Sequence, residues 1–283
     1  MQDEKIAVDF YGAEINGNFT SPLQDKITLQ PGTNVRIDVV VRTKGIGHKF
    51  PGGTIDSNEP WLQVFVQNEN GETIYGSGLL DGKKFVDQSA HFFRGILLDK
   101  HGEFILKRNP HEWVTTLYNN SIPPGSAEVI HYEWDVPDGV NDGFKIIANL
   151  NYRKFNRSIT ETFLDEPIYL PIVTMASDTV TIVVHSQNSN LKVEDAIRIN
   201  DFGIGMFRQN NLEAARTAFT QVTELNPKYA DGFVNLARVL IKEGKFDLAE
   251  QALSSAESMK PEFPKVAFFR GMIAKKWSNY PKA

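Results

Sequence analysis

A repeat of 34 residues is the feature that most constrains how this chain can fold. Pro227 and Pro261 are 34 residues apart, and the residues before each proline share one register. In the first copy, small or apolar side chains occupy Gly203, Met206, Ala215, Phe219 and Val222. Their counterparts 34 residues later are also small or apolar: Ala237, Leu240, Ala249, Leu253 and Ala256. Agreement at so many positions indicates a repeat architecture.

A period of 34 residues is typical of the tetratricopeptide repeat, in which each copy is a pair of antiparallel helices. The small residues let the two helices approach closely, the larger ones fill the space between them, and proline ends the second helix. We predict such an array over residues 192–283, with two complete copies and a third beginning at Pro264. Because the sequence stops where the second helix of that third copy should open, we expect it to be part of a longer chain.

Residues 1–186 follow a different pattern, with apolar side chains at every second position. One such stretch runs from Val35 to Val41, and others run over 62–66, 130–136 and 180–184. Turn-prone pairs such as Pro31-Gly32 and Asn70-Gly71 separate them. Short strands with one apolar face predict an antiparallel β-sandwich. We therefore predict an α+β multidomain chain: a β-sandwich over 1–186, a polar linker at 187–191, and the helical repeats.

The two parts also differ in charge. Residues 187–283 carry 14 Lys and Arg against 11 Asp and Glu, which leaves 16 against 24 for residues 1–186. The formal net charge of the whole chain is -5, so a generally basic nucleic-acid binder is excluded. No stretch approaches the roughly eighteen apolar residues that a membrane span needs.

The chain contains no cysteine. This excludes disulfides, zinc-thiolate sites, cysteine catalysis and covalent attachment of haem c within the chain. Signatures of a nucleophile elbow, a phosphate loop and a dinucleotide fold are also missing. We therefore expect no catalytic activity from this chain alone.

The densest cluster of chemically interesting residues is the glycine-rich stretch 45–56, which contains His48. The small neighbours of His48 would let a large planar group approach its ring, and imidazole can be an axial haem ligand. The competing interpretation is a structured loop whose histidine bonds to the backbone. His91 lies beside Phe92 and Phe93 and is the second candidate. Nearby carboxylates such as Asp56 and Glu59 leave a metal-dependent site around His48 as a further alternative.

Several short motifs resemble the β domain of certain bacterial multihaem c-type cytochromes. They are Gly47-His48-Lys49-Phe50-Pro51, Glu59-Pro60-Trp61, Gly76-Ser77-Gly78, Ala90-His91, Ile122-Pro123-Pro124-Gly125 and the stretch 149–155. The order of a β domain followed by tetratricopeptide repeats is similar too. The resemblance implies export to the periplasm or the cell exterior, and haem c in an upstream region or in a partner subunit. The resemblance also places the β domain beside the haems, and we expect His48, or failing it His91, to approach such a haem as a candidate axial ligand.

Three functions remain open. The first is a haem-free docking and partner-binding module of a multihaem electron-transfer protein. The second is a stand-alone adaptor that binds peptides through its repeats, and the third is a metal-dependent enzyme centred on His48. In the first two, we expect a basic groove on the repeats to bind a protein or peptide. Its predicted polar residues are Arg198, Asn200, Arg208, Asn235, Arg238 and Lys242.

Overall fold

A computed structural model of the chain describes residues 5–15, 18–20, 32–105, 109–137, 143–163, 168–183 and 192–278. The chain divides into two compact units, residues 1–188 and 189–283. The predicted linker at 187–191 lies outside the described residues. Antiparallel β structure in the first unit and helices in the second confirm the predicted α+β class.

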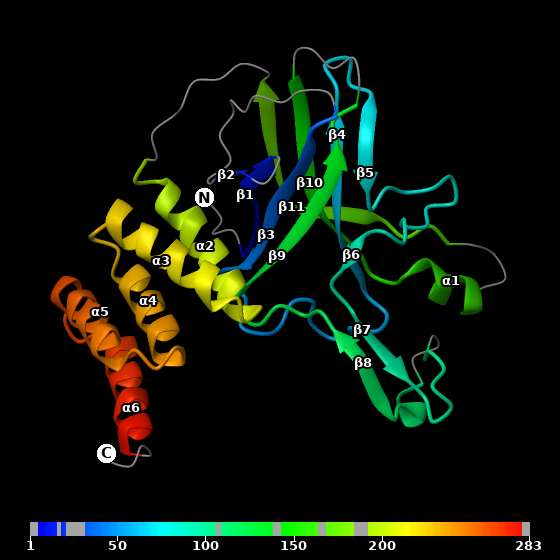
Figure 1. Cartoon of the computed structure of the whole chain (residues 1–283). Coiled ribbons are helices and arrows are strands. Elements are labelled where there is room, and N and C mark those ends of the chain that lie inside the picture. The colour runs from blue at the N-terminus through cyan, green and yellow to red at the C-terminus, as the bar shows by residue number, and fades with distance from the viewer. Residues whose placement is uncertain are drawn as a thin grey trace. The chain divides into compact units, whose positions relative to one another are not determined.

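The first unit is built on two antiparallel sheets (Figure 1). One sheet has the order β2-β1-β3-β9, formed by Asn18–Thr20, Ile6–Ile15, Asn34–Thr43 and Ala127–Asp135. The other has the order β11-β10-β4-β5, formed by Ile172–Val183, Gly143–Arg153, Glu59–Gln67 and Thr73–Ser77. A short strand β6, His91–Phe92, also pairs with β4. Neighbouring strands are therefore often distant in sequence.

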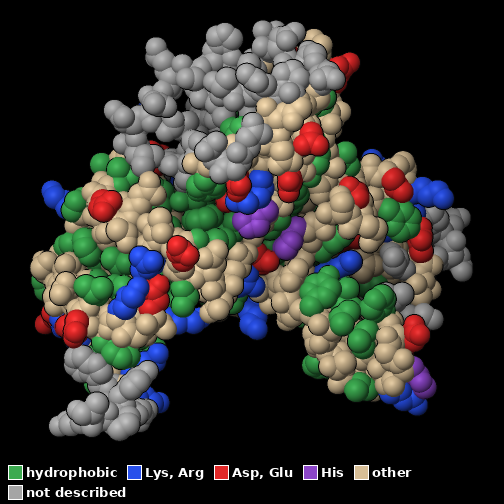
Figure 2. Space-filling model, in the orientation of Figure 1, with side chains coloured by type: hydrophobic (Ala, Val, Ile, Leu, Met, Phe, Trp, Pro, Cys, Tyr) green, Lys and Arg blue, Asp and Glu red, His purple; other side chains and the backbone are tan. Residues whose placement is uncertain are grey.

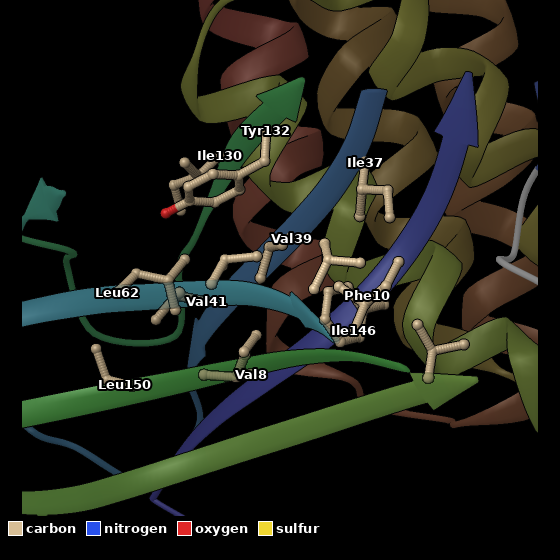
Figure 3. Packing of buried hydrophobic residues seen from close by; sticks show 14 of the residues in the cluster. Val8, Phe10, Ile37, Val39, Val41, Leu62, Ile130, Tyr132, Ile146 and Leu150 are labelled. Carbon is tan, nitrogen blue, oxygen red and sulfur yellow. The ribbon is translucent and has the colours of Figure 1, made fainter. Parts of the chain in front are cut away.

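The core of this unit lies between the two sheets. Val8 and Phe10 of β1 and the alternate residues of β3 point toward Leu62 of β4 and Ile146 of β10 (Figure 3). All of these side chains are buried. Successive side chains of a strand point to opposite faces of a sheet. The apolar residues at every second position of the sequence are therefore the ones that face the core.

A buried ion pair joins two neighbouring strands of the second sheet, and one of its members also reaches a neighbouring loop. The guanidinium of Arg153, at the end of β10, pairs with the carboxylate of Glu59, which begins β4. Arg153 also donates to the carbonyl of Lys84, 2.8 Å away. The short helix α1, Arg157–Phe163, follows β10, and Arg157 lies over the ring of Tyr169.

A separate hairpin projects apolar side chains into solvent. Strands β7, Gly95–Leu98, and β8, Thr115–Asn119, pair with each other, and the 3-10 turn Pro110–Glu112 precedes β8. Hydrophobic side chains gather over this hairpin in Figure 2, and the exposed ones are Phe104, Trp113, Val114, Leu117 and Tyr118.

The second unit consists of helices packed as antiparallel pairs. They are α2 (Asp195–Arg208), α3 (Leu212–Leu225), α4 (Ala230–Lys242), α5 (Phe246–Met259) and α6 (Pro264–Ser278). Asn211 caps α3, because its side-chain oxygen accepts a hydrogen bond from the amide of Ala214. The helix boundaries follow the 34-residue register, so α2–α3 and α4–α5 are the two complete repeats and α6 opens the third.

The small repeat residues lie where helices touch. A methyl group at Gly203 of α2 would come within 2.6 Å of the Phe219 ring on α3. Its counterpart Ala237 is fully buried in the cluster formed by α4, α5 and α6. Side-chain size at this position therefore sets how closely the helices of a pair approach, as the repeat pattern predicts.

Candidate functional site

The repeat unit contains a groove formed by α2, α4 and α6. Its volume is about 610 Å³. Apolar and aromatic side chains form the floor: Phe207, Val234, Ile241, Pro264, Phe268, Phe269 and Met272. The groove is also lined by four cationic side chains, Arg238, Lys242, Lys265 and Lys276. No Asp or Glu lines it. Such a surface favours a ligand with both acidic and apolar groups.

Arg238 is fixed at the centre of this groove. Its guanidinium donates to the side-chain oxygen of Asn235 at 3.0 Å and lies 4.8 Å from the centre of the Phe207 ring. Asn235 in turn donates to the buried Asn200 at 2.8 Å. The ammonium of Lys242 lies 5.2 Å from the same Phe207 ring. Hydrogen bonds and cation–π contacts thus hold two cations in defined positions before any ligand arrives.

The predicted groove residues divide into two sets. Asn235, Arg238 and Lys242 line the groove. Asn200 is buried behind it and positions Asn235, while Arg198 and Arg208 are half-buried on α2 and are not among the lining residues. Three of the six predicted residues are therefore brought together on one surface, and a fourth supports them.

Several lining residues were missed by the sequence argument. Phe269, Met272 and Lys276 of α6 lie 34 residues after Asn235, Arg238 and Lys242. Extending the repeat register once more would have identified all three. Phe207 and Phe268 lie 34 residues from Ile241 and Val234, which also line the groove. None of these four was predicted, because the spacing does not distinguish an apolar groove residue from a core residue.

The β unit contains a second cavity, of about 870 Å³, beside His48. The glycine-rich stretch 45–53 forms one wall, and residues from β1, β10 and β11 complete it. The stretch is anchored at three points. The carbonyl of Lys5 accepts the amide of Gly45, Phe50 exchanges backbone hydrogen bonds with Ile122, and Asn58 donates to the carbonyl of Gly52. The cavity wall is therefore well defined although it is a loop.

The imidazole of His48 is exposed and held in one orientation. Its Nδ1 lies 2.8 Å from the carbonyl oxygen of Lys49, a contact that requires Nδ1 to carry the proton. Gly52 lies directly beneath the ring, since a methyl group there would come within 2.7 Å of the His48 Cε1 atom. The backbone contact expected of a structured loop is thus present, and in the neutral ring it leaves Nε2 as the unprotonated nitrogen.

The second candidate, His91, lies in a different environment. Its Nε2 is buried 3.2 Å from the carboxylate of Glu128, and its ring packs edge-on against Phe93 with 5.0 Å between ring centres. His91 does not line the cavity beside His48. His48 and His91 therefore do not share a cavity, and His91 contacts Glu128 and Phe93 within the sandwich.

The residues considered for a metal site around His48 are not brought together in the described part of the chain. Over the described ranges, no three side chains of His, Asp or Glu lie close enough together to hold a metal ion. Asp56 and Glu59 do not line the cavity beside His48, and Glu59 is paired with Arg153. Among the same residues, no helix is long and apolar enough to cross a bilayer.

Comparison with known proteins bears on the repeats most directly. Residues 206–270 match the family model described as tetratricopeptide repeat. None of the curated proteins matches the chain significantly.

Solved structures resemble the chain only distantly. A penta-haem cytochrome c552 from Thermochromatium tepidum is 16% identical over 63% of this chain, with a TM-score of 0.43, and the match spans 40% of that protein's length. The structure of MamA is 22% identical over 30% of this chain and 61% of its own, with a TM-score of 0.24. The C-terminal domain of wzt is 11% identical over 68% of this chain and 90% of its own, with a TM-score of 0.26. The family match and the paired helices together identify the C-terminal unit as a tetratricopeptide-repeat array, a class of domain suited to binding other proteins.

Proposed function

We propose that this chain is a binding module whose repeat groove holds an acidic, apolar segment of a protein partner. The groove carries the proposal, because its cations surround an aromatic floor and no carboxylate lines it. Arg238 and Lys242, which both lie over the Phe207 ring, are the principal anchors for acidic side chains. Apolar side chains of the partner would cover Phe268 and Met272, which are exposed.

Charge reversal in the groove tests this proposal. The probe is a fluorescently labelled peptide of about twelve residues in which Glu alternates with Phe and Leu, long enough to span a peptide groove. We expect the double variant R238E/K242E to weaken its binding at least about tenfold, measured by fluorescence anisotropy.

Matched controls make the result specific. K192E/K228E changes the net charge equally at exposed lysines that do not line the groove, and it should leave the affinity within about twofold. A peptide with Lys in place of Glu should bind the unmodified protein poorly. Equal loss in both double variants, or no binding of the acidic peptide at all, would refute the groove assignment.

We infer further that the partner is a haem-containing region or subunit of an exported multihaem cytochrome, beside which the β unit docks. The geometry of His48 supports this second step. With Nδ1 bonded to the Lys49 carbonyl, Nε2 is the nitrogen that an iron would meet, and a side chain at Gly47 or Gly53 would meet no atom within 4 Å, which leaves room for a flat group. A bound haem would supply electron transfer, while this chain supplies a positioned imidazole and an apolar wall at Phe50 and Pro51.

A haem peptide with one open coordination position provides the test on the isolated chain. If His48 is available as a ligand, adding the chain shifts the absorption of the ferric haem peptide toward the low-spin form. H48A should abolish the shift, whereas H101A, at an exposed turn, should retain it. A shift that is absent, or that survives H48A, would remove His48 from this role and leave the groove proposal intact. Periplasmic or extracellular location is part of the same inference and is tested by fractionating the source cells.

A further inference from the structure

The cavity beside His48 combines an apolar wall with two lysines among its lining residues. The wall is lined by Ile6, Ile46, Phe50, Pro51, Ile55 and Met175. The charged lining residues are Lys5 and Lys49, and no Asp or Glu lines the cavity. This pairing of surfaces is unusual for a unit whose formal charge is strongly negative, so it calls for a specific explanation.

The position of Lys5 is set by the backbone. Its carbonyl oxygen accepts hydrogen bonds from the amides of Lys44 at 2.9 Å and Gly45 at 3.3 Å. Its side chain then runs across Gly45, where a methyl group would lie 3.7 Å from the Lys5 Cγ atom. A long side chain that rests its methylene groups on backbone can keep its ammonium at the edge of an apolar surface.

Lys49 also lines this cavity. It is exposed, and its carbonyl orients His48. Within the part of the chain that the structure describes, neither Lys5 nor Lys49 forms an ion pair with a carboxylate. Both ammonium groups are therefore available to an anionic ligand.

We propose that this cavity binds a small amphipathic carboxylate, with its apolar body against the wall and its carboxylate between Lys5 and Lys49. A volume of about 870 Å³ lies within the range of small-molecule sites. Asn119, Ser121 and Tyr152 supply polar groups that can fix the orientation of the ligand. A cationic ligand would be repelled by the two lysines, and a neutral one would leave the ammonium groups without a partner. The ligand would occupy the wall at Phe50 and Pro51 that a docked haem would also use, so the two would compete for this cavity. The inference requires neither haem ligation by His48 nor the repeat groove.

A matched pair of fluorescent ligands tests the proposal. Pyrenebutyrate and pyrenebutanol share an apolar body and differ in the carboxylate. We expect the unmodified chain to bind pyrenebutyrate about ten times more tightly than pyrenebutanol, a difference of about 1.4 kcal/mol, as read from pyrene fluorescence. In K5Q/K49Q, which retains the length of both side chains approximately, the preference should fall to about twofold or less, while binding of the alcohol is retained.

The control variant is K100Q/K145Q, which removes two exposed lysines of the same unit that do not line the cavity. It should keep the preference for the acid. M175K, which places a charge on the apolar wall, should weaken binding of the alcohol, and an unchanged circular dichroism spectrum would show that the variant is folded. Equal affinity for acid and alcohol, no binding of either, or a preference that survives K5Q/K49Q would overturn the proposal.

Discussion

At the scale of single residues, the contact between Glu59 and Arg153 is a buried ion pair between residues that are far apart in the sequence. The two side chains are 7% and 3% exposed and come from strands 94 residues apart. Burial raises the pKa of Glu59 above its ordinary value of 4.5, and Arg153 acts against that rise. A buried ion pair of this kind adds modest net stability, but removing one partner leaves the other charge buried without a counter-ion.

Replacing Arg153 with Met should destabilise the β unit by about 3–5 kcal/mol at pH 7, because the carboxylate of Glu59 loses its counter-ion. The loss should shrink at lower pH. Because the pKa of Glu59 is raised in the folded state, the folded chain binds the proton of this carboxyl more strongly than the unfolded chain does. The contribution of Glu59 to stability is therefore greatest below its unfolded pKa of about 4.5, and it is lost as the pH rises through its folded pKa. Urea unfolding of R153M and the unmodified protein at pH 7 and pH 5 measures both effects.

The double variant E59Q/R153M provides the control for this prediction. It removes both charges, so it should regain most of the stability lost in R153M, and its deficit should not depend on pH. A deficit of R153M that is the same at both pH values would show that Glu59 is not the group left uncompensated.

At the scale of elements, one position of the repeat occurs in three environments. Gly203, Ala237 and Gly271 are each 34 residues apart on α2, α4 and α6. A methyl group at Gly203 would overlap the fully buried ring of Phe219, whereas a methyl group at Gly271 would meet no atom within 4 Å. The same substitution should therefore have opposite effects at equivalent positions.

G203A should destabilise the repeat unit by about 1–3 kcal/mol through overpacking. G271A should stabilise it by about 0.5–1 kcal/mol, because alanine loses less backbone entropy than glycine in a helix. Guanidinium unfolding followed by helical circular dichroism measures both changes. If both variants were stabilised, the closeness of α2 and α3 at Gly203 would be wrong; if both were destabilised, Gly271 would not lie in open space.

The elements also show what a single sequence can predict. Helical repeats are local, so the register alone identified the helix pairs and placed Asn235, Arg238 and Lys242 on the groove. The β unit depends on distant pairings, and no local pattern places Lys5 and Met175 beside Gly45. Period-two alternation therefore predicts that the unit is an antiparallel β-sandwich but not that its strands have the order β11-β10-β4-β5. For the same reason the sequence indicates His48 as a candidate residue but does not predict the cavity beside it.

At the scale of the whole molecule, each unit has a hydrophobic cluster of its own. The sandwich cluster is formed only by residues between Ile6 and Ile182, and the cluster around α4 to α6 only by residues between Val234 and Ile273. Cores that share no residue can unfold separately, since cooperativity arises from common packing. The sequence likewise predicts two separately folded units, residues 1–186 and 192–283, and unfolding experiments on the intact chain test this prediction.

Calorimetry of the intact chain should accordingly resolve two unfolding transitions. R153M should lower the midpoint of one, and G203A should lower the midpoint of the other, by about 4–8 °C for each kcal/mol in the smaller unit of roughly 90 residues and less in the larger. In the combined variant the two shifts should add, because the substituted residues lie in different units and share no contact partner. Limited proteolysis checks the same point independently, with first cleavage expected within residues 187–190, the polar run between the units. A single transition shifted by both substitutions, or first cleavage inside either unit, would show that the chain unfolds as one cooperative body.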